Sequence, residues 1–544
     1  MRALRVGGAL IPIALIPLAF IGVFFAWPVV TLLWRGLGAD VGGDGSRLGE
    51  VLANARYQRI IWFTFWQAAL STALTAVAAL PLTWAVANRT FVGRRAARVL
   101  VTVPFVLPTV VVAGAFTAVM DRFGLNSGTV QLRHTVAAII LAHVFFNVAV
   151  VVRSVGSFWS QLDRTPEQAA RTLGASPWRA FRAVTLPRLR PPLLAALSIV
   201  FLFTFTSFAI ILLLGGLGKA TLETEIFRAA LTNFDIPTAA ALSVVQLVAV
   251  AALMIANTAL ARRASHQQRL IGDRAQPIRG RRDRVLVTSA IWGTALFLAI
   301  PIMTLIERSF ARRDGFTLAN YQALRVRARQ LPISALDALA NSLAFAVAAA
   351  GIALLIGGIA ALVIVHGRSS LSRVLELATL LPLGTSAVTL GFGVLITLDS
   401  GVFDLRASWW IIPITQSLIA IPFVIRSVVP VLRAIDPTLR EAAATLGASP
   451  TQVRREIDLS IGGRALATGV GFAFAISLGE FGATSFVGRR SDLLTVPLAI
   501  ARLLGRPGDL LRGQAMALSV ILMVVTALVV VIGDRFHPSG KGVL

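Results

Sequence analysis

The sequence predicts an all-α integral membrane protein built from two similar halves. Of its 544 residues, 56% are hydrophobic, and the mean hydropathy is +0.79. Several uninterrupted apolar runs reach the roughly 20 residues that a helix needs to cross a bilayer. A polar stretch of closely similar sequence also occurs once in each half. These observations predict about twelve transmembrane helices, arranged as two parallel repeats of six.

The repeated polar stretch is the clearest sign of duplication. It reads DRTPEQAARTLGASP at 163–177 and DPTLREAAATLGASP at 436–450. The same offset of 273 residues (436 − 163) aligns Phe208 with Phe481 without a gap. An identity this long, kept at a constant offset by other residues, indicates an internal repeat rather than chance.

Six apolar segments in each half are expected to span the membrane. With the ends placed as below, none of the 51 lysine and arginine residues lies inside a span. The first half, an arginine-rich linker and the second half are predicted at 1–261, 262–284 and 285–544. The predicted spans are 9–33, 61–86, 99–120, 135–152, 191–214, 238–261, 285–306, 338–365, 375–397, 408–425, 465–487 and 513–533.

The basic residues also predict the orientation in the membrane. If the N-terminus is cytoplasmic, the loops on that side carry the larger share of lysine and arginine, as the positive-inside rule requires. Residues 307–337 are an exception, with six arginines on the opposite side, but long loops are translocated largely regardless of charge. We therefore expect both termini on the cytoplasmic side of the membrane, with the inner membrane of a prokaryote implied only by the family resemblance.

The composition excludes several classes of function. The net charge of +26 is spread along loops that flank the spans, so membrane lipids rather than nucleic acid are the expected partner. The absence of cysteine excludes disulfides and thiolate sites, and the five histidines are scattered without ligand spacing. No metal site and no catalytic residue is predicted.

Each copy of the repeated stretch is expected to begin with a capped helix. Thr165 and Thr438 stand three residues before Gln168 and Glu441. At this spacing a hydroxyl and a carboxylate or amide can satisfy each other's free backbone N–H groups. We therefore predict a capping box at the start of both helices.

A sharp corner and a second short helix should follow in each copy. Gly174 and Gly447 stand where a helix ends in the left-handed conformation that glycine adopts most easily. The dipeptides 176–177 and 449–450 are Ser-Pro, a serine N-cap followed by a proline at the first helical position. The sequence thus predicts a stiff, bent pair of helices in each half.

Glu480 is the one acidic residue well inside a predicted span, in the segment SLGEFGATSF. The residue aligned with it in the first half is Ser207. An intramembrane carboxylate normally faces protein or a water-filled path. Two interpretations stay open: Glu480 lines a translocation path together with Ser207, Phe208 and Phe481, or it holds a break in the span by hydrogen bonds.

At this point the residues carry a family resemblance. EAAATLGASP at 441–450 resembles the EAA signature of permease subunits of binding-protein-dependent ABC importers, and the first copy is a slightly altered instance. The fused layout is similar to that of thiamine and ferric-iron permeases. FWQAALS at 65–71, LAHVFFN at 141–147 and SFAIILLLGG at 207–216 look most like the thiamine permease.

The resemblance implies a type I ABC importer permease fold and a transport role without enzymatic activity. An extracytoplasmic binding protein would deliver the solute, and two copies of an ATPase subunit would bind ATP and Mg. This chain is expected to bind no cofactor, and it has no GxxxxGK[ST] phosphate loop. Each bent loop would dock in one ATPase. The resemblance assigns these coupling-loop residues: Glu167, Gln168, Ala169, Ala170, Gly174, Ser176, Pro177, Glu441, Ala442, Ala443, Gly447, Ser449 and Pro450.

The chain departs from the family pattern in two places, and alternatives stay open. Gln168 stands where the signature has glutamate, with Glu167 one residue earlier, and Ser460 replaces the proline that Pro187 supplies in the first copy. Thiamine or a thiamine-like compound is the expected substrate, with ferric iron, molybdate or sulfate as alternatives. The alternative from another class is an ion-coupled secondary transporter, for which Glu480 would be the coupling group.

Overall fold

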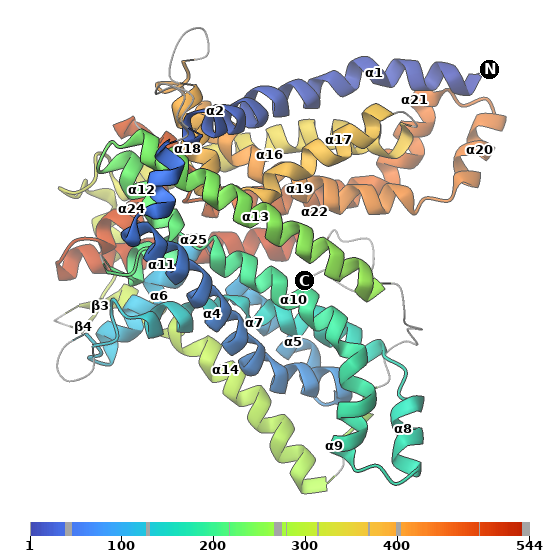
Figure 1. Ribbon diagram of the computed structural model, residues 1–544, viewed down its shortest axis with the longest axis horizontal. Coiled ribbons are helices and arrows are strands. Elements are labelled where there is room, and N and C mark those ends of the chain that lie inside the picture. Colours follow the sequence, from blue (N-terminus) through green and yellow to red (C-terminus); the bar gives the residue numbers. More distant parts are fainter. Residues whose placement is uncertain are drawn as a thin grey trace.

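The computed structural model describes residues 2–37, 46–126, 131–216, 218–265, 275–278, 280–312, 315–367, 370–398, 404–488 and 490–535. These residues form an all-helical bundle with two very short strand pairs (Figure 1). The elements of the first half are α1 Arg2–Ile21, η1 Gly22–Ala26, α2 Trp27–Gly36, α3 Ser46–Ala53, α4 Ala55–Asn88, β1 Arg89–Thr90, α5 Arg94–Val106, α6 Thr109–Arg122, α7 Val136–Gln161, α8 Thr165–Thr172, α9 Pro177–Ala180, η2 Phe181–Thr185, α10 Leu186–Phe205, α11 Ala209–Leu214, α12 Leu222–Leu231 and α13 Ile236–Ser265.

The second half repeats this order of elements. Part of the predicted linker, 266–274 and 279, lies outside the described residues. The elements that follow it are β2 Gln276–Pro277, α14 Gly280–Phe310, β3 Ala311–Arg312, β4 Gly315–Phe316, α15 Ala319–Gln322, η3 Ala323–Arg325, α16 Ala335–His366, α17 Ser370–Leu380, η4 Leu381–Gly384, α18 Ala387–Thr397, α19 Ile411–Arg433, α20 Pro437–Thr445, α21 Pro450–Val453, η6 Arg454–Asp458, α22 Leu459–Gly479, α23 Thr484–Val487, η7 Ser491–Leu493, α24 Val496–Leu504 and α25 Asp509–Arg535.

The predicted all-α membrane fold is confirmed. Within the described residues, ten helices are long and apolar enough to span a bilayer, or twelve if two bent pairs each count as one span. The bent pairs are α5–α6, with an angle of 101°, and α17–α18, with an angle of 105°. Prolines cause the first bend, because Pro108 cannot continue a helical hydrogen-bond ladder and the residue before it is forced out of the helical region.

Two predicted spans end earlier than the sequence indicated. Within the predicted spans 191–214 and 465–487, α10 ends at Phe205 and α22 at Gly479, and the short helices α11 and α23 follow after a break. A break at Glu480 is one of the two interpretations that the sequence leaves open, whereas no break is predicted in the first-half span. Hydropathy averaged over a whole span reveals neither break.

The first helix of each half packs on the other half. Helix α1 lies along α16 and α17, whereas α14 lies along α4, α5 and α6 (Figure 1). This exchange follows the internal symmetry, since α16 and α17 are the repeats of α4 and α5. The two halves are therefore interlocked along their length.

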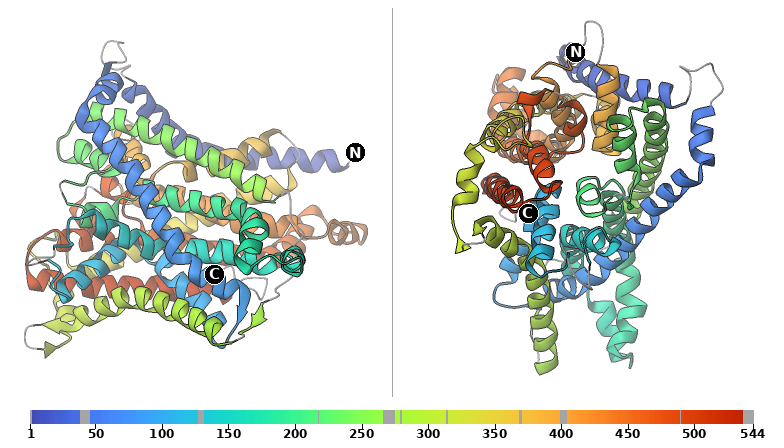
Figure 2. Two further views of the ribbon diagram at one scale, coloured as in Figure 1. Left: turned by 60° about the horizontal axis from the view of Figure 1, so that its bottom comes forward. Right: turned by 90° about the vertical axis from the view of Figure 1, so that its left-hand side faces the viewer.

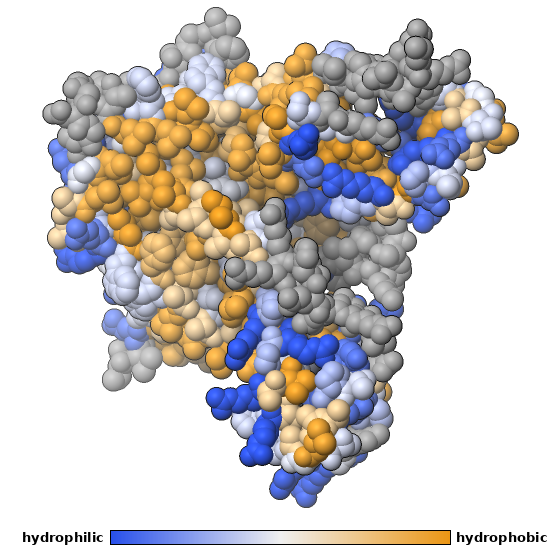
Figure 3. Space-filling view, turned by 45° about the vertical axis from the view of Figure 1, so that its right-hand side comes forward, coloured by the Kyte–Doolittle hydropathy of each residue, from blue (hydrophilic) through white to orange (hydrophobic). Residues whose placement is uncertain are grey.

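Both bent loops project from the same end of the bundle, the end where the N-terminus lies (Figures 1 and 2). The loop α8–α9 and the loop α20–α21 form separate protrusions there. In Figure 3 hydrophilic side chains gather at these protruding ends, and a broad apolar surface lies beside them. This arrangement agrees with a bilayer around the apolar surface and the loops in water.

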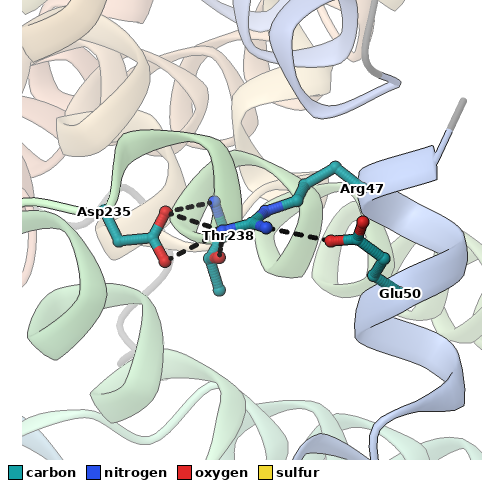
Figure 4. Close-up of polar contacts among 4 residues, drawn as sticks. All are labelled: Arg47, Glu50, Asp235 and Thr238. Carbon is teal, nitrogen blue, oxygen red and sulfur yellow. Dashed lines mark hydrogen bonds and ion pairs between the residues drawn. The ribbon is translucent and has the colours of Figure 1, made fainter. Parts of the chain in front are cut away.

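At the opposite end, an ion-pair cluster ties α3 to the start of α13 (Figure 4). Arg47 lies 3.2 Å from Asp235, donates to Thr238 at 2.9 Å and pairs with Glu50 at 2.9 Å. Burial alone would raise the pKa of Asp235, but the hydrogen bonds from Thr238 and the charge of Arg47 outweigh burial and lower it.

Candidate functional site

The two helix breaks meet between the halves. Phe208 follows the end of α10, and Phe481 follows the end of α22, at equivalent positions of the repeat. Their rings stack with centroids 5.2 Å apart and an interplanar angle of 23°. Both side chains are buried, with 6% and 4% exposed. The structure thus brings together two residues that the sequence had marked as candidates for the pathway.

Further phenylalanines extend this pair into an aromatic cluster. Phe227 of α12 lies 5.3 Å from Phe208, and Phe486 of α23 lies 5.7 Å from Phe227. Phe392 of α18 lies 5.9 Å from Phe486. Because the rings come from both halves, the cluster closes the space between them with apolar side chains.

Glu480 occupies the break itself rather than the middle of a helix. Its Oε1 accepts the Ala483 N–H at 2.7 Å, and its Oε2 accepts the Thr484 N–H at 2.8 Å and the Thr484 hydroxyl. A carboxylate at this place satisfies the free N–H groups at the start of α23, as an N-cap does. Its side chain is 7% exposed. These contacts favour the interpretation in which Glu480 holds the span break.

The first half has a different polar group at the same place. Ser207, the counterpart of Glu480, lies 2.9 Å from Nε2 of His143, whose Nδ1 lies 3.1 Å from Ser71. In the second half Gln416, the counterpart of His143, donates to Thr484 at 3.4 Å. The sequence analysis missed His143 and Gln416, although the 273-residue offset that aligns Ser207 with Glu480 also aligns these two.

A second buried acid near the halves' interface was also missed. Glu223 of α12 has no exposed surface. Its Oε1 accepts a hydrogen bond from Gln246 at 2.7 Å, and its Oε2 accepts one from Ser386 at 3.1 Å. Ser386 is the N-cap of α18 in the other half. Glu223 lies outside every predicted span, so it was not among the predicted intramembrane acids.

The bent loops have the predicted corners. Gly174 and Gly447 both have φ of +91°. In each loop the glycine N–H bonds to the carbonyl three residues earlier, and the next N–H bonds to the carbonyl five residues earlier, at 3.0 to 3.1 Å. This is the Schellman pattern that satisfies the last carbonyls of a helix. The serine caps are also present: Ser176 accepts from Arg179 N–H, and Ser449 from Gln452 N–H.

The predicted capping boxes at the start of the loops are wrong. Asp163 accepts the N–H and the hydroxyl of Thr165, and Asp436 accepts the N–H of Thr438. Each aspartate stands two residues before the threonine, and its charge interacts more favourably with a helix N-terminus than a hydroxyl does. The Thr438 N–H accordingly holds the pKa of Asp436 below its ordinary value.

Each loop presents one large apolar side chain to solvent at its corner. Leu173 is 88% exposed, and its counterpart Leu446 is 89% exposed. In the first loop Trp178 is also 68% exposed. Both loops thus hold an exposed apolar side chain on a corner that backbone hydrogen bonds fix.

A polar contact fastens each loop to the base of the following span. In the first half the Thr185 hydroxyl donates to Glu167 at 2.6 Å. At the equivalent positions of the second half, Arg440 donates to Asp458 at 2.8 Å. The contact lies at equivalent positions in both halves, but it is a hydroxyl–carboxylate hydrogen bond in the first half and an arginine–aspartate ion pair in the second.

In the described part of the chain, no group of three or more His, Asp or Glu side chains could hold a metal ion.

Comparison with known proteins agrees with this architecture. Residues 79–266 and 353–539 each match the model of the family described as binding-protein-dependent transport system inner membrane component. The chain is 27% identical to the thiamine transport system permease protein of Escherichia coli (strain K12) over 456 residues, which cover 82% of this chain and 83% of that protein. Identity to the thiamine transport system permease protein of Brucella abortus (strain 2308) is also 27%, over 93% of this chain and 92% of that protein.

A relative with a less specific name shows similar coverage. A probable ABC transporter permease protein of Sinorhizobium fredii is 24% identical over 80% of this chain and 82% of that protein. The family model matches both halves and most of the chain, in agreement with the duplicated, multi-pass membrane structure. This chain therefore belongs to the binding-protein-dependent transport system inner membrane component family, as a permease with two fused copies of the family domain.

Proposed function

We propose that this chain is the membrane-spanning subunit of an ATP-driven importer, and that its two bent loops transmit force from a pair of ATPase subunits. The observation that carries this proposal is the shared construction of the loops. Both leave the same end of the bundle, turn at a left-handed glycine and expose a leucine at the corner. That end of the bundle would be cytoplasmic, and we propose that both termini lie on that side of the membrane.

The rigidity of the loops supports a mechanical role. Each corner is fixed by two backbone hydrogen bonds, and each first helix is tied to the base of the next span through Glu167 or Arg440. A push on the corner would therefore move α10 or α22 rather than deform the loop. These two helices end at Phe205 and Gly479, beside the stacked pair Phe208–Phe481. Movement of the spans would separate the rings and open the space between the halves.

The proposed substrate is thiamine or a thiamine-like compound. The named thiamine permeases among its relatives support this choice. The chemistry of the closed rings also favours it, because phenylalanine faces attract flat cations and the rings of Phe208 and Phe481 stack between the halves. Ferric iron, which prefers several oxygen ligands together, finds no such group among the described residues.

The test is transport by the reconstituted complex. The chain would be co-expressed with a candidate ATPase and a candidate binding protein from the same genome, and labelled thiamine uptake into proteoliposomes would be measured with and without ATP. We expect ATP-dependent uptake that unlabelled thiamine competes away and that ferric iron and molybdate leave unchanged. Uptake of one of the other solutes would refute the substrate. Failure of any ATPase to co-purify with the wild type would refute the class.

An aspartate at the loop corner gives a sharper test of docking. Leu446→Asp should weaken retention of the ATPase, because a charge would replace the exposed apolar side chain at the contact. Leu439→Asp is the matched control, since Leu439 lies on the same helix and is also exposed, at 50%. Equal ATPase retention by Leu446→Asp and wild type would contradict the assignment of the corner as the docking point.

A further inference from the structure

The second half contains an apolar groove on its outer side. It has a volume of about 480 Å³ and lies between α16, α19 and the start of α22. Leucine is its commonest lining residue, and two of the leucines are well exposed, Leu355 at 61% and Leu459 at 54%. Gly358 and Gly462 also line it; a Cβ added at Gly358 would meet only a Leu466 methyl group, at 3.8 Å, whereas one at Gly462 would come within 2.8 Å of a Leu432 methyl group. The volume is within the range of sites that bind small molecules.

In the first half, aromatic rings occupy the equivalent positions. Trp159, Phe181 and Trp178 form a continuous stack, with centroid distances of 5.8 and 5.6 Å. The residues 273 positions later are Leu432, Arg454 and Thr451, and all three line the groove.

Glycine extends the difference. Gly358 and Gly462 stand where the first half has Ala85 and the buried Leu189. At these five positions the first half has Trp159, Phe181, Trp178, Ala85 and Leu189, and the second half has Leu432, Arg454, Thr451, Gly358 and Gly462. The groove is a specific feature of one half and not a general property of the fold.

One end of the groove is basic. Arg454 and Arg455 line it where η6 follows the second bent loop. Among the described residues, neither guanidinium makes a hydrogen bond or ion pair with a protein group. Asp458 also borders the groove, but Arg440 pairs with it at 2.8 Å and His366 lies 2.9 Å from it. The two arginines therefore place positive charge at one end of the apolar groove.

We propose that this groove is a binding site for an anionic phospholipid. One acyl chain would lie along the leucines between α16 and α22, and the phosphate would contact Arg454 and Arg455. The combination of an exposed apolar groove and basic side chains at its end matches a lipid with a charged headgroup. The lipid would sit at the base of the second bent loop, and no matching lipid would bind the first half.

The experiment is native mass spectrometry of the full chain, released from nanodiscs that contain equal amounts of phosphatidylglycerol and phosphatidylcholine with the same acyl chains. The wild type should retain one phosphatidylglycerol in preference to phosphatidylcholine. Arg455→Gln should reduce this preference about fivefold, the effect of about one basic residue at a lipid surface. The matched control is Arg182→Gln, since Arg182 is the exposed first-half counterpart of Arg455. It should leave lipid retention unchanged.

A second variant tests the groove without changing charge. At Gly358 an added Cβ would meet a single neighbour, a Leu466 methyl group, at 3.8 Å. Gly358→Leu should therefore fold, fill the groove and abolish retention of the bound lipid. Equal retention of both lipids by the wild type would overturn the proposal. So would unchanged phosphatidylglycerol retention in Gly358→Leu, or a peptide found bound in place of the lipid.

Discussion

Replacing Glu480 by glutamine should destabilise the chain, because the buried site uses both carboxylate oxygens as acceptors. Oε1 receives the Ala483 N–H, and Oε2 receives the N–H and the hydroxyl of Thr484. A glutamine amide has one acceptor oxygen. Whichever way the amide is turned, its NH₂ group faces a backbone N–H that has lost its partner.

The magnitude follows from the number of donors left without an acceptor. One buried unsatisfied donor costs about 1–3 kcal/mol, and the 7% exposure of Glu480 leaves little access for compensating water. We therefore expect Glu480→Gln to lower the free energy of unfolding by about 1–3 kcal/mol. Glu480→Ala, which leaves three donors unsatisfied, should cost more. Glu456→Gln is the control, since Glu456 is exposed and its loss should change stability little.

Thermal unfolding of the full chain in nanodiscs measures this difference, followed by tryptophan fluorescence. Uptake, normalised to the amount of assembled complex, would be measured in parallel. If Glu480 holds the span break, Glu480→Gln unfolds at a lower temperature and the folded fraction still transports. Wild-type stability in Glu480→Gln would refute the capping role. Wild-type stability combined with lost uptake would assign the charge to the transport pathway instead.

Three further predictions concern the loops and the opposite end of the bundle. Gly447→Val should reduce substrate-stimulated ATPase activity, because a β-branched residue at φ +91° costs about 1–3 kcal/mol. Gly463→Val, at a helical glycine with similar free space, should leave this activity unchanged. Equal activities of the two variants would contradict a role of the Gly447 corner in coupling. A cysteine replacing Ser449 in this cysteine-free chain should react with an impermeant thiol reagent only after cells are opened, and labelling from outside would reverse the orientation. Asp235→Asn should lower stability at pH 7 by up to about 1 kcal/mol. Because the pKa of Asp235 is lowered in the folded state, the stability it contributes is fully present above the unfolded-state pKa of about 4. This contribution is lost as the pH falls through the folded-state pKa. A difference in stability between wild type and variant that persisted at low pH would therefore contradict the ion pair with Arg47.

Features that depend on local sequence could be predicted well. Long apolar runs locate the spans because each must bury or present a hydrocarbon surface over a fixed thickness. The left-handed corners at Gly174 and Gly447 follow from glycine's freedom at positive φ. The capping residues could have been found by the same reasoning. Asp436 stands two residues before Thr438, and its charged carboxylate is a stronger acceptor for the helix N-terminus than the threonine hydroxyl.

Features that depend on the meeting of distant segments could not be predicted from hydropathy. At Glu480 the sequence allowed either a pathway group or a span break, and only the contacts with Ala483 and Thr484 favour the break. Glu223 finds its partners Gln246 and Ser386 on two other helices. The pairing of Ser207 with His143 was within reach, since the repeat aligns them with Glu480 and Gln416. These residues lie outside the repeated polar stretch, and only the 273-residue offset applied to the whole of both halves aligns them.

The exchange of first helices has a consequence for how this chain is made. Helix α1 emerges from the ribosome first, but the helices it packs against, α16 and α17, begin at Ala335 and Ser370. At about 5–20 residues per second, α1 spends on the order of tens of seconds in the membrane before its partners exist. During that interval lipid, or an insertion factor, must cover the face that α16 will later occupy. The N-terminal half thus cannot complete its own structure, and biogenesis finishes for both halves together.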